Sequence, residues 1–269
     1  MKQRFKDKVV FITGASSGIG AESARQLAAE GARLALLARR EDKLASVKAE
    51  IEALGAPVRT VAADVNDRKA LDAAVAGTLE AFGRIDIVLA NAGTGVTGPL
   101  FKLTVDDYRR QFETNFFGLL NTIYATLDAL KASHGQLGLL GSVAGVVGTP
   151  SASAYNASKF AVNGLGESIY HDLDELGIAV TLIKPGFVDS EIRHLDRQGR
   201  VSDKPDPVPA WLVLSTPRAA RVILNALYWR KPEVTVTFHG KVFTWCKRLL
   251  PGATRWVIRR MSKGRLPKL

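Results

Sequence analysis

Tyr155 and Lys159 stand four residues apart in the run YNASK, within a stretch whose apolar spacing predicts a helix over 153–176. Side chains four residues apart lie on one face of a helix, so the phenol and the ammonium are expected to be neighbours. A phenol with its ordinary pKa of about 10 exchanges protons poorly near pH 7, and an adjacent positive charge lowers that pKa. The pair therefore suits acid-base chemistry on an oxygen atom, although the solvent face of an amphipathic helix would tolerate the same two residues.

A second motif is the run TGASSGIG at residues 13–20, where the chain is expected to turn from a strand into a helix. Glycine lets backbone N–H groups approach a phosphate closely, and the positive end of the helix favours an anion there. An isolated Gly/Ser turn would be an ordinary loop, but between the first strand and the first helix it indicates a nucleotide site. The residues expected to bind the phosphates are Gly14, Ser16, Ser17, Gly18, Ile19 and Gly20.

Two arginines, Arg39 and Arg40, follow the second expected strand at 33–38. A ribose with a free 2′-hydroxyl is usually held by Asp or Glu at this point, whereas a 2′-phosphate attracts Arg and repels a carboxylate. The sequence therefore favours NADP(H) over NAD(H). The alternative is that both arginines are solvated charges before a helix whose first turn carries Glu41 and Asp42.

These residues are positioned by short apolar runs that alternate with stretches of helical period, the pattern of a parallel α/β sheet. The expected strands are 9–13, 33–38, 58–62, 86–90, 137–141, 179–183 and 234–237. The expected helices are 18–30, 41–54, 67–82, 104–132, 153–176 and 217–230. The fold class is thus α/β: a single Rossmann-like, doubly wound parallel sheet with helices on both faces, plus a basic amphipathic C-terminal extension.

The expected division of the chain is a cofactor-binding and catalytic domain over 1–238 and an extension over 239–269. Within the domain, the Pro-rich and charged segment 190–217 follows the sixth strand, where it is placed to cover a substrate. Its apolar stretch 211–214 indicates a hydrophobic substrate, or else anchors the segment to the core.

Charge is distributed unevenly over the 269 residues, which carry 37 Lys or Arg against 26 Asp or Glu. Residues 211–269 hold 13 Lys or Arg and one acid, Glu233, a formal charge of +12, whereas residues 1–210 carry −1. The single Cys246 excludes a disulfide scaffold and predicts a reducing compartment. We expect neither a membrane span nor a signal peptide, and hence a cytoplasmic protein.

The stretch 241–261 combines these cations with tryptophans, and Val242, Trp245, Cys246, Leu249 and Leu250 fall on one helical face before Pro251 interrupts it. Such a segment suits peripheral attachment to a lipid surface. The alternative is that its apolar face packs on the body or on a partner subunit. Nucleic acid is not expected as a partner, because no recognised nucleic-acid module occurs.

Taken together, the motifs resemble the short-chain dehydrogenase/reductase family from about Lys8 through about Ser190, with weaker similarity to about Val236. The resemblance rests on motifs in the family's order, including those above. The others are Asp64-Val65, Asn91-Ala92-Gly93, Asn115, Ser142 and Pro185-Gly186.

The resemblance implies a role for each matching residue. Tyr155 is the general acid in reduction and the base in oxidation, Lys159 lowers its pKa and binds the nicotinamide ribose, and Ser142 hydrogen-bonds the substrate oxygen. Asn115 helps to hold a water that relays protons. The further cofactor contacts are assigned to Asp64, Val65, Asn91, Ala92, Gly93, Pro185, Gly186, Val188 and Ser190. Ser190 stands where family members commonly carry Thr. Because Ser also has a side-chain hydroxyl, the hydrogen-bonding group is retained.

The expected function is an NADP(H)-dependent oxidoreductase that moves hydride between nicotinamide and a carbonyl or secondary alcohol of a hydrophobic substrate. The alternative is an NADP(H)-binding sensor or scaffold anchored by its basic tail. The resemblance also implies a homodimer or homotetramer, with contacts through the helices at 104–132 and 153–176. No metal site is expected, because the four histidines, His134, His171, His194 and His239, show no ligand spacing.

Overall fold

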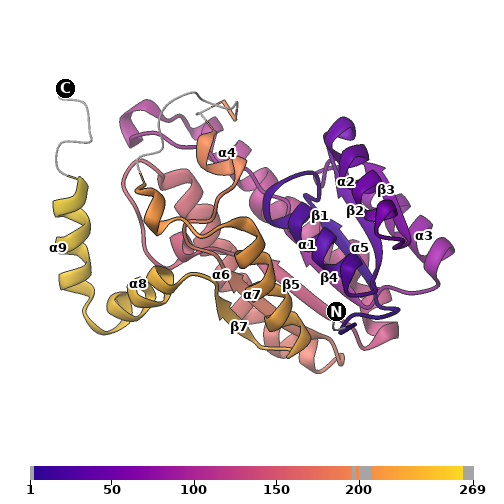
Figure 1. Ribbon diagram of the computed structural model, residues 1–269. Helices are drawn as coiled ribbons and strands as arrows, with labels where there is room; N and C mark the ends of the chain where they lie inside the picture. The colour runs from indigo at the N-terminus through magenta and orange to yellow at the C-terminus, as the bar shows by residue number, and fades with distance from the viewer. Residues whose placement is uncertain (1–2, 196–197, 200–207, 263–269) are drawn as a thin grey trace.

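The computed structural model describes residues 3–195, 198–199 and 208–262, and its centre is one seven-stranded parallel sheet (Figure 1). The strand order is β3-β2-β1-β4-β5-β6-β7. The strands are β1 (Val9–Thr13), β2 (Arg33–Ala38), β3 (Val58–Ala62), β4 (Ile87–Ala90), β5 (Gln136–Leu140), β6 (Ala179–Lys184) and β7 (Glu233–Thr235). The predicted doubly wound α/β fold is confirmed.

Helices cover both faces of the sheet. They are α1 (Gly18–Ala29), α2 (Glu41–Ala53), α3 (Arg68–Phe82), α4 (Val105–Phe112), α5 (Gly118–Ser133), α6 (Ser153–Asp174) and α7 (Thr216–Tyr228). Residues of α1, α2 and α7 share one core cluster, and residues of α3, α5 and α6 share the other. Along β1, Val10 and Ile12 face the first cluster while Val9 and Phe11 face the second, as the alternation of side chains in a strand requires.

The long helix predicted over 104–132 is interrupted. A π-helical turn, Glu113–Phe117, separates α4 from α5. The bounds of β4, β5, β6 and β7 also differ from the prediction by one or two residues. Asp86 lies before β4, since its carboxylate accepts from Val9 N at 3.0 Å, and Gly141 lies beyond β5. Thr237 lies beyond β7, because its hydroxyl caps the next helix.

Two helices follow β7, α8 (Phe238–Leu249) and α9 (Pro251–Ser262), at the left-hand edge of the molecule in Figure 1. The break between them falls at Leu250, directly before Pro251, as the sequence predicts. Among the described residues, no helix is long and apolar enough to cross a membrane. Of the segment 190–217, residues 196–197 and 200–207 lie outside the described part of the chain.

Candidate active site

The order of strands creates a crevice where the chain winds away in opposite directions from β1 and from β4. The turns after these two strands meet there. Asn91 Nδ2 donates to the carbonyls of Thr13 and Gly14, both at 3.0 Å, while Thr13 Oγ1 accepts from Asn91 N and Ala92 N, both at 3.2 Å. The structure thereby brings together the glycine-rich turn and the Asn91-Ala92-Gly93 motif, both of which the resemblance assigns to cofactor binding.

Glycine is required in this turn for a steric reason. Gly14 has φ +67°, and a Cβ there would lie 2.8 Å from Ala92 Cα. A Cβ at Gly20 would overlap the carbonyl oxygen of Gly14. The surrounding backbone therefore leaves no space for a side chain at Gly14 or Gly20.

Helix α1 begins at this turn without a side-chain cap. Its N-cap residue, Ser17, makes no capping hydrogen bond, whereas α3 is capped by Asp67 and α4 by Thr104. Like α2, α6 and α7, α1 has no side-chain N-cap, and its first-turn N–H groups lie at the glycine-rich turn, which fits the binding of a phosphate. A Cβ added at Gly18 would lie 3.4 Å from Ser190 Cβ, so Ser190, one of the predicted cofactor contacts, lies next to this turn.

The arginines after β2 lie beside this turn. Arg40 Nη2 donates to Ser17 Oγ at 2.7 Å and to Ser16 Oγ at 3.3 Å, and Arg39 Nη1 is 3.5 Å from Asp64 Oδ2. Both arginine side chains are more than 40% exposed, so they remain accessible to an anionic ligand.

A carboxylate that the sequence analysis did not single out, Glu191, also reaches the arginines. It lies 2.7 Å from Arg40 Nη1 and forms a second ion pair with Lys43. Partial burial would raise the pKa of Glu191, but hydrogen bonds from Lys43 and Arg40 outweigh it and lower the pKa to about 2. Glu191 is therefore an anion near pH 7.

On the other side of the crevice, Tyr155 and Lys159 project from the first half of α6. Lys159 Nζ lies 6.0 Å from the centre of the Tyr155 ring and donates to Leu140 O at 2.7 Å. Leu140 ends β5, so this bond holds the ammonium at the carboxyl end of the sheet.

Burial dominates the electrostatics of this pair. It raises the pKa of Tyr155, and a hydrogen bond with Ser142 opposes that rise only in part. Burial also lowers the pKa of Lys159 to about 8. In the protein without cofactor, burial therefore raises the pKa of Tyr155, because removing the phenolate from water is unfavourable. Tyr155 is protonated near pH 7 and ready to donate.

Ser142 directly follows Gly141 at the end of β5, and both its backbone and its hydroxyl are held in place. Its Oγ accepts from Ala144 N at 3.0 Å and donates to Pro185 O at 3.4 Å. Asn163 holds the backbone from α6: Nδ2 donates to Ser142 O at 3.0 Å and Oδ1 accepts from Ser142 N at 3.3 Å. The sequence analysis missed Asn163, although it continues the four-residue spacing of Tyr155 and Lys159.

Asn115 lies in the π-helical turn, a feature common at functional positions. Its Nδ2 donates to Thr94 O and to Ser158 Oγ, both at 3.1 Å, and its Oδ1 accepts from Thr94 N at 2.8 Å. A Cβ at Gly93 would lie 3.3 Å from Asn115 Oδ1. Asn115 thus joins the loop after β4 to helix α6 next to Tyr155.

The remaining predicted cofactor residues lie at the two ends of the crevice. Asp64 and Val65 follow β3, with Asp64 half-exposed beside Arg39 and Val65 buried against Gly118. At the other end, Val188 forms a parallel bridge with Leu214, and Ser190 Oγ donates to Val188 O at 3.3 Å.

His239 packs on the loop after β6, a contact that the sequence analysis did not predict. Its Nε2 accepts from Phe187 N at 3.1 Å, and its ring stacks on that of Phe187 with centres 5.1 Å apart. A Cβ at Gly186 would lie only 2.5 Å from His239 Nε2. Partial burial lowers the pKa of His239, so the neutral ring that accepts this bond is favoured.

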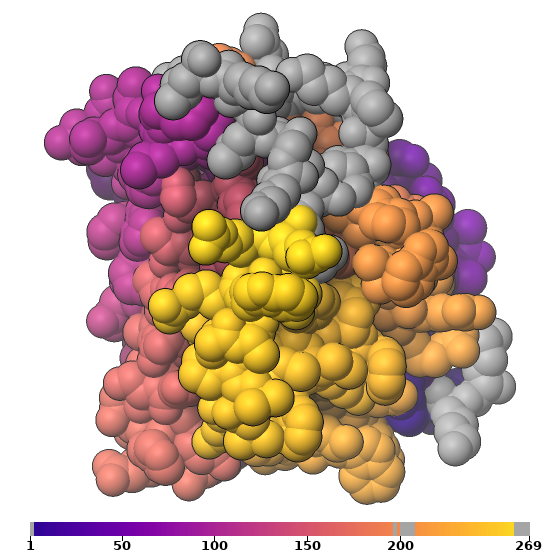
Figure 2. Space-filling model, turned by 90° about the vertical axis from the view of Figure 1, so that its left-hand side faces the viewer, coloured from indigo at the N-terminus to yellow at the C-terminus, as the bar shows by residue number. Residues whose placement is uncertain are grey.

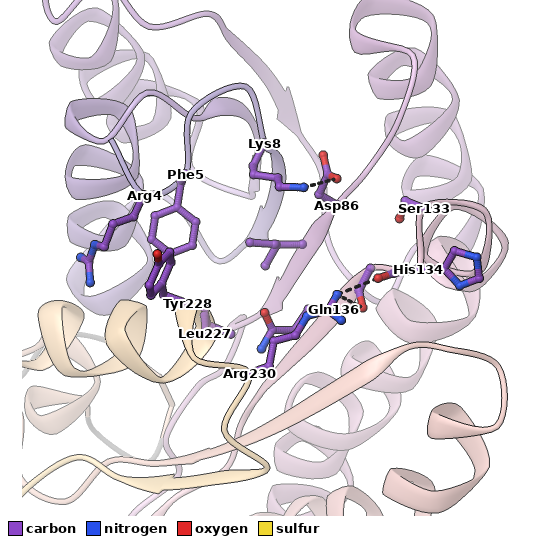
Figure 3. A pocket seen from close by; sticks show the side chains of 12 residues that line it. Arg4, Phe5, Lys8, Asp86, Ser133, His134, Gln136, Leu227, Tyr228 and Arg230 are labelled. Atoms are coloured by element: carbon purple, nitrogen blue, oxygen red, sulfur yellow. Dashed lines mark hydrogen bonds and ion pairs between the residues drawn. The ribbon is translucent and has the colours of Figure 1, made fainter. Parts of the chain in front are cut away.

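A cavity of about 270 Å³ lies at the opposite, amino-terminal end of the strands (Figure 3). Its polar lining is paired internally: Lys8 Nζ lies 3.3 Å from Asp86 Oδ1, and Arg230 Nη2 donates to His134 O at 2.7 Å. Because ligands of open α/β sheets bind beyond the carboxyl ends of the strands, this cavity is not the active site. In the part of the chain that the structure describes, no cluster of His, Cys, Asp or Glu could hold a metal ion.

Comparison with known proteins agrees with this geometry. The chain matches the family model for short chain dehydrogenase over residues 8–200. It is 36% identical over 265 residues to an uncharacterized oxidoreductase of Bacillus subtilis (94% of this chain, 71% of the relative). It is 34% identical over 262 residues to an 11-beta-hydroxysteroid dehydrogenase A of Sesamum indicum (94% and 75%).

Among solved structures, a carveol dehydrogenase from Mycobacterium avium in complex with NAD aligns with a TM-score of 0.78 at 26% identity, covering 87% of this chain and 97% of that one. The fold and the site define a nucleotide-binding α/β oxidoreductase. The chain belongs to the short-chain dehydrogenase family.

Proposed function

We propose that the protein is an NADP(H)-dependent oxidoreductase that interconverts a carbonyl group and a secondary alcohol on a hydrophobic substrate. The observation that carries this proposal is the meeting of Tyr155, Ser142 and Lys159 at the carboxyl end of the sheet. On the other side of the crevice lie the uncapped start of α1 and the two arginines.

The residues fit a dinucleotide. The glycine-rich turn leaves no room for a Cβ, so a pyrophosphate can approach its backbone closely. Lys159 and Asn91 would hold the nicotinamide half, and Asp64 with Val65 the adenine half. When bound, the cofactor supplies or accepts the hydride.

The side chains perform the proton chemistry. In reduction, Tyr155 donates its phenolic proton to the carbonyl oxygen while Ser142 donates a hydrogen bond to the same oxygen. The ammonium of Lys159 then stabilises the phenolate that remains. Asn163 fixes the position of Ser142 by hydrogen-bonding both its backbone N–H and its backbone carbonyl.

The preference for NADP(H) rests on Arg39 and Arg40, which flank the position of the adenosine ribose. Because a similar solved structure holds NAD, the preference of this chain for NADP(H) has to be tested directly. Arg39→Asp and Arg40→Asp should each raise KM for NADPH about tenfold and lower that for NADH, because each reverses a charge facing a 2′-phosphate. An unchanged ratio of the two kcat/KM values would remove the arginines from the cofactor site.

A hydrophobic substrate is supported by exposed apolar side chains in loops at the carboxyl end of the sheet: Leu100, Phe101 and Trp211 are 69%, 55% and 81% exposed. Likeness to a hydroxysteroid dehydrogenase agrees with this. Turnover with NADPH over steroids, aromatic ketones, long-chain aldehydes and sugars tests the proposal. A preference for sugars would overturn the hydrophobic class.

We further infer a homo-oligomer built through α5 and α6, and a cytoplasmic location. The π-helical turn before α5 exposes Phe117, α5 exposes Tyr124 and α6 exposes Phe160, and Cys246 is a free thiol. Light scattering after size-exclusion chromatography should give a dimer or tetramer mass, and Tyr124→Glu with Phe160→Glu should reduce it to that of a monomer.

A further inference from the structure

Helix α8 presents its apolar side outward. The side chains at i, i+3, i+4, i+7, i+10 and i+11 are all exposed, and they are Phe238, Lys241, Val242, Trp245, Arg248 and Leu249. The opposite side of α8 is buried: a Cβ at Gly240 would lie 2.8 Å from Cγ2 of Val143, the residue that follows Ser142. The alternative that the apolar face of this segment packs on the body is thus excluded for α8.

Helix α9 continues the same surface. Trp256 is 61% exposed, Val257 and Leu250 are also exposed, and the guanidinium of Arg260 lies 5.5 Å from the centre of the Trp256 ring. Figure 2 shows the two helices in yellow in the lower middle of one face, between salmon and orange segments of the body. We call the exposed residues of α8 and α9 the tail surface.

The charge of the tail surface indicates which kind of partner it fits. Residues 234–269 contain no Asp or Glu, while 241–269 contain nine Lys or Arg. A second copy of this chain docked symmetrically would set these cations against one another. Tryptophan rings mixed with cations instead match the boundary between anionic headgroups and acyl chains.

We propose that the tail surface docks the enzyme on an anionic lipid bilayer, with Trp245 and Trp256 at headgroup depth. A cavity of about 210 Å³ lies between α9 and residues 147–148, in the loop that follows Ser142. A docked bilayer would therefore lie next to the catalytic side of the sheet, where a hydrophobic substrate is consumed.

The test is flotation of the full chain with vesicles of phosphatidylcholine alone or mixed with phosphatidylglycerol. The protein should float with the mixed vesicles only, and less at high salt. Trp245→Glu with Leu249→Glu should lower binding on the order of tenfold or more, and so should Lys241→Glu with Arg248→Glu. The matched control is Trp229→Glu, which changes an equally exposed tryptophan at the end of α7 and should bind as the native chain does.

Three outcomes would overturn the proposal. The first is equal flotation of all variants, and the second is no flotation with the anionic vesicles. The third is a loss of oligomer mass in the Trp245→Glu variant without vesicle binding, which would make the tail surface an interface between copies. Circular dichroism and turnover of a soluble ketone verify that each variant is folded.

A separate observation concerns Glu191, and the inference from it rests on the proposed preference for NADP(H). The Glu191 carboxylate bridges Arg40 and Lys43 at the position where those cations would meet a 2′-phosphate. A phosphate and this carboxylate repel each other and compete for the same guanidinium. We infer that Glu191 weakens NADP(H) binding and so brings the affinities for the two cofactors closer together.

Glu191→Gln keeps the size of the side chain and removes its charge. KM for NADPH should fall about two- to fivefold and KM for NADH should stay within about twofold. Asp189→Asn, which removes an exposed carboxylate two residues away, is the control. A rise in KM for NADPH would show that Glu191 only positions Arg40, which overturns the inference; Arg40→Asp tests the underlying preference independently.

Discussion

The candidate catalytic centre and the tail differ in which side chains they bury and which they expose. At the centre, polar groups point inward and each is held by a neighbour: Lys159 by Leu140 O, and Ser142 by Asn163 and Pro185. In the tail, tryptophans point outward while small residues such as Gly240 face the body. Burial shifts pKa values at the centre, whereas the tail leaves apolar area uncovered. The comparison separates the residues that we propose for chemistry from those that we propose for attachment to a lipid surface.

The largest effect tests the centre. Tyr155→Phe should lower kcat about 100- to 10,000-fold, because it removes the proton donor while leaving the ring and NADPH binding in place. Steady-state turnover and NADPH fluorescence titration measure the two properties. Tyr170→Phe, on the same helix, should change kcat by less than about twofold. Retained turnover in Tyr155→Phe would contradict the assigned role.

The next test compares glycines in the two regions. A Cβ at Gly145 would overlap the carbonyl oxygen of Lys159, whereas one at Gly252 in α9 meets open space. Gly145→Ala should lower the free energy of unfolding by about 2 to 3 kcal/mol, and Gly252→Ala should raise it by up to about 1 kcal/mol. Urea unfolding of both variants checks this; equal effects would deny the difference in packing.

The buried Lys159 predicts an unusual pH dependence of stability. Its pKa is 10.5 when unfolded and about 8 when folded, so between these values the unfolded chain binds more protons. The free energy of unfolding should therefore gain from this residue as pH rises from about 8 to 10, by about 2 kcal/mol, and lose that gain as pH falls through 8.

Lys159→Met should abolish this gain, whereas the exposed Lys241→Met should leave it intact. Urea unfolding of the cofactor-free protein at several pH values between 7 and 10 measures it. The same slope in the native chain and in Lys159→Met would show that the ammonium is not desolvated.

The smallest expected effect lies in the tail. Thr244 Oγ1 is buried in α8 without a hydrogen-bond partner, so Thr244→Val should raise the free energy of unfolding by about 0.5 to 1 kcal/mol. At Thr126 the buried hydroxyl donates to Thr122 O at 2.8 Å, so Thr126→Val should lower it by about 1 kcal/mol. Chemical unfolding of the pair measures both, and changes of the same sign would contradict this difference.

The sequence predicted every strand to within one or two residues, because parallel strands covered on both faces are nearly continuous apolar runs. The four-residue spacing also predicted that Tyr155 and Lys159 share a helix face, which is a local feature, whereas Ser142 was placed beside them by the resemblance to the family. The π-helical turn at Asn115 was missed because its periodicity differs from that of an α-helix over only five residues.

Contacts between distant segments were the other failure. Glu191 reaches Arg40 and Lys43 across about 150 positions of the chain, and His239 reaches Phe187 from beyond the last strand. Neither residue belongs to a spaced motif, so no pattern in the sequence indicates which cations or loops it will find. The direction in which α8 faces was likewise undetermined, because amphipathicity alone does not tell which side meets water.

The bond from Phe187 N to His239 has a practical consequence for anyone who shortens this chain. Thr237 and His239 contact each other and support the loop that carries Val188 and Ser190. The tail is thus not detachable at the 238/239 boundary that its composition indicates. A deletion there would remove a residue that supports this loop, so lost turnover in such a protein would say nothing about lipids. Substitutions of outward-facing residues such as Trp245 leave His239 in place, so they test lipid binding without disturbing the loop that His239 supports.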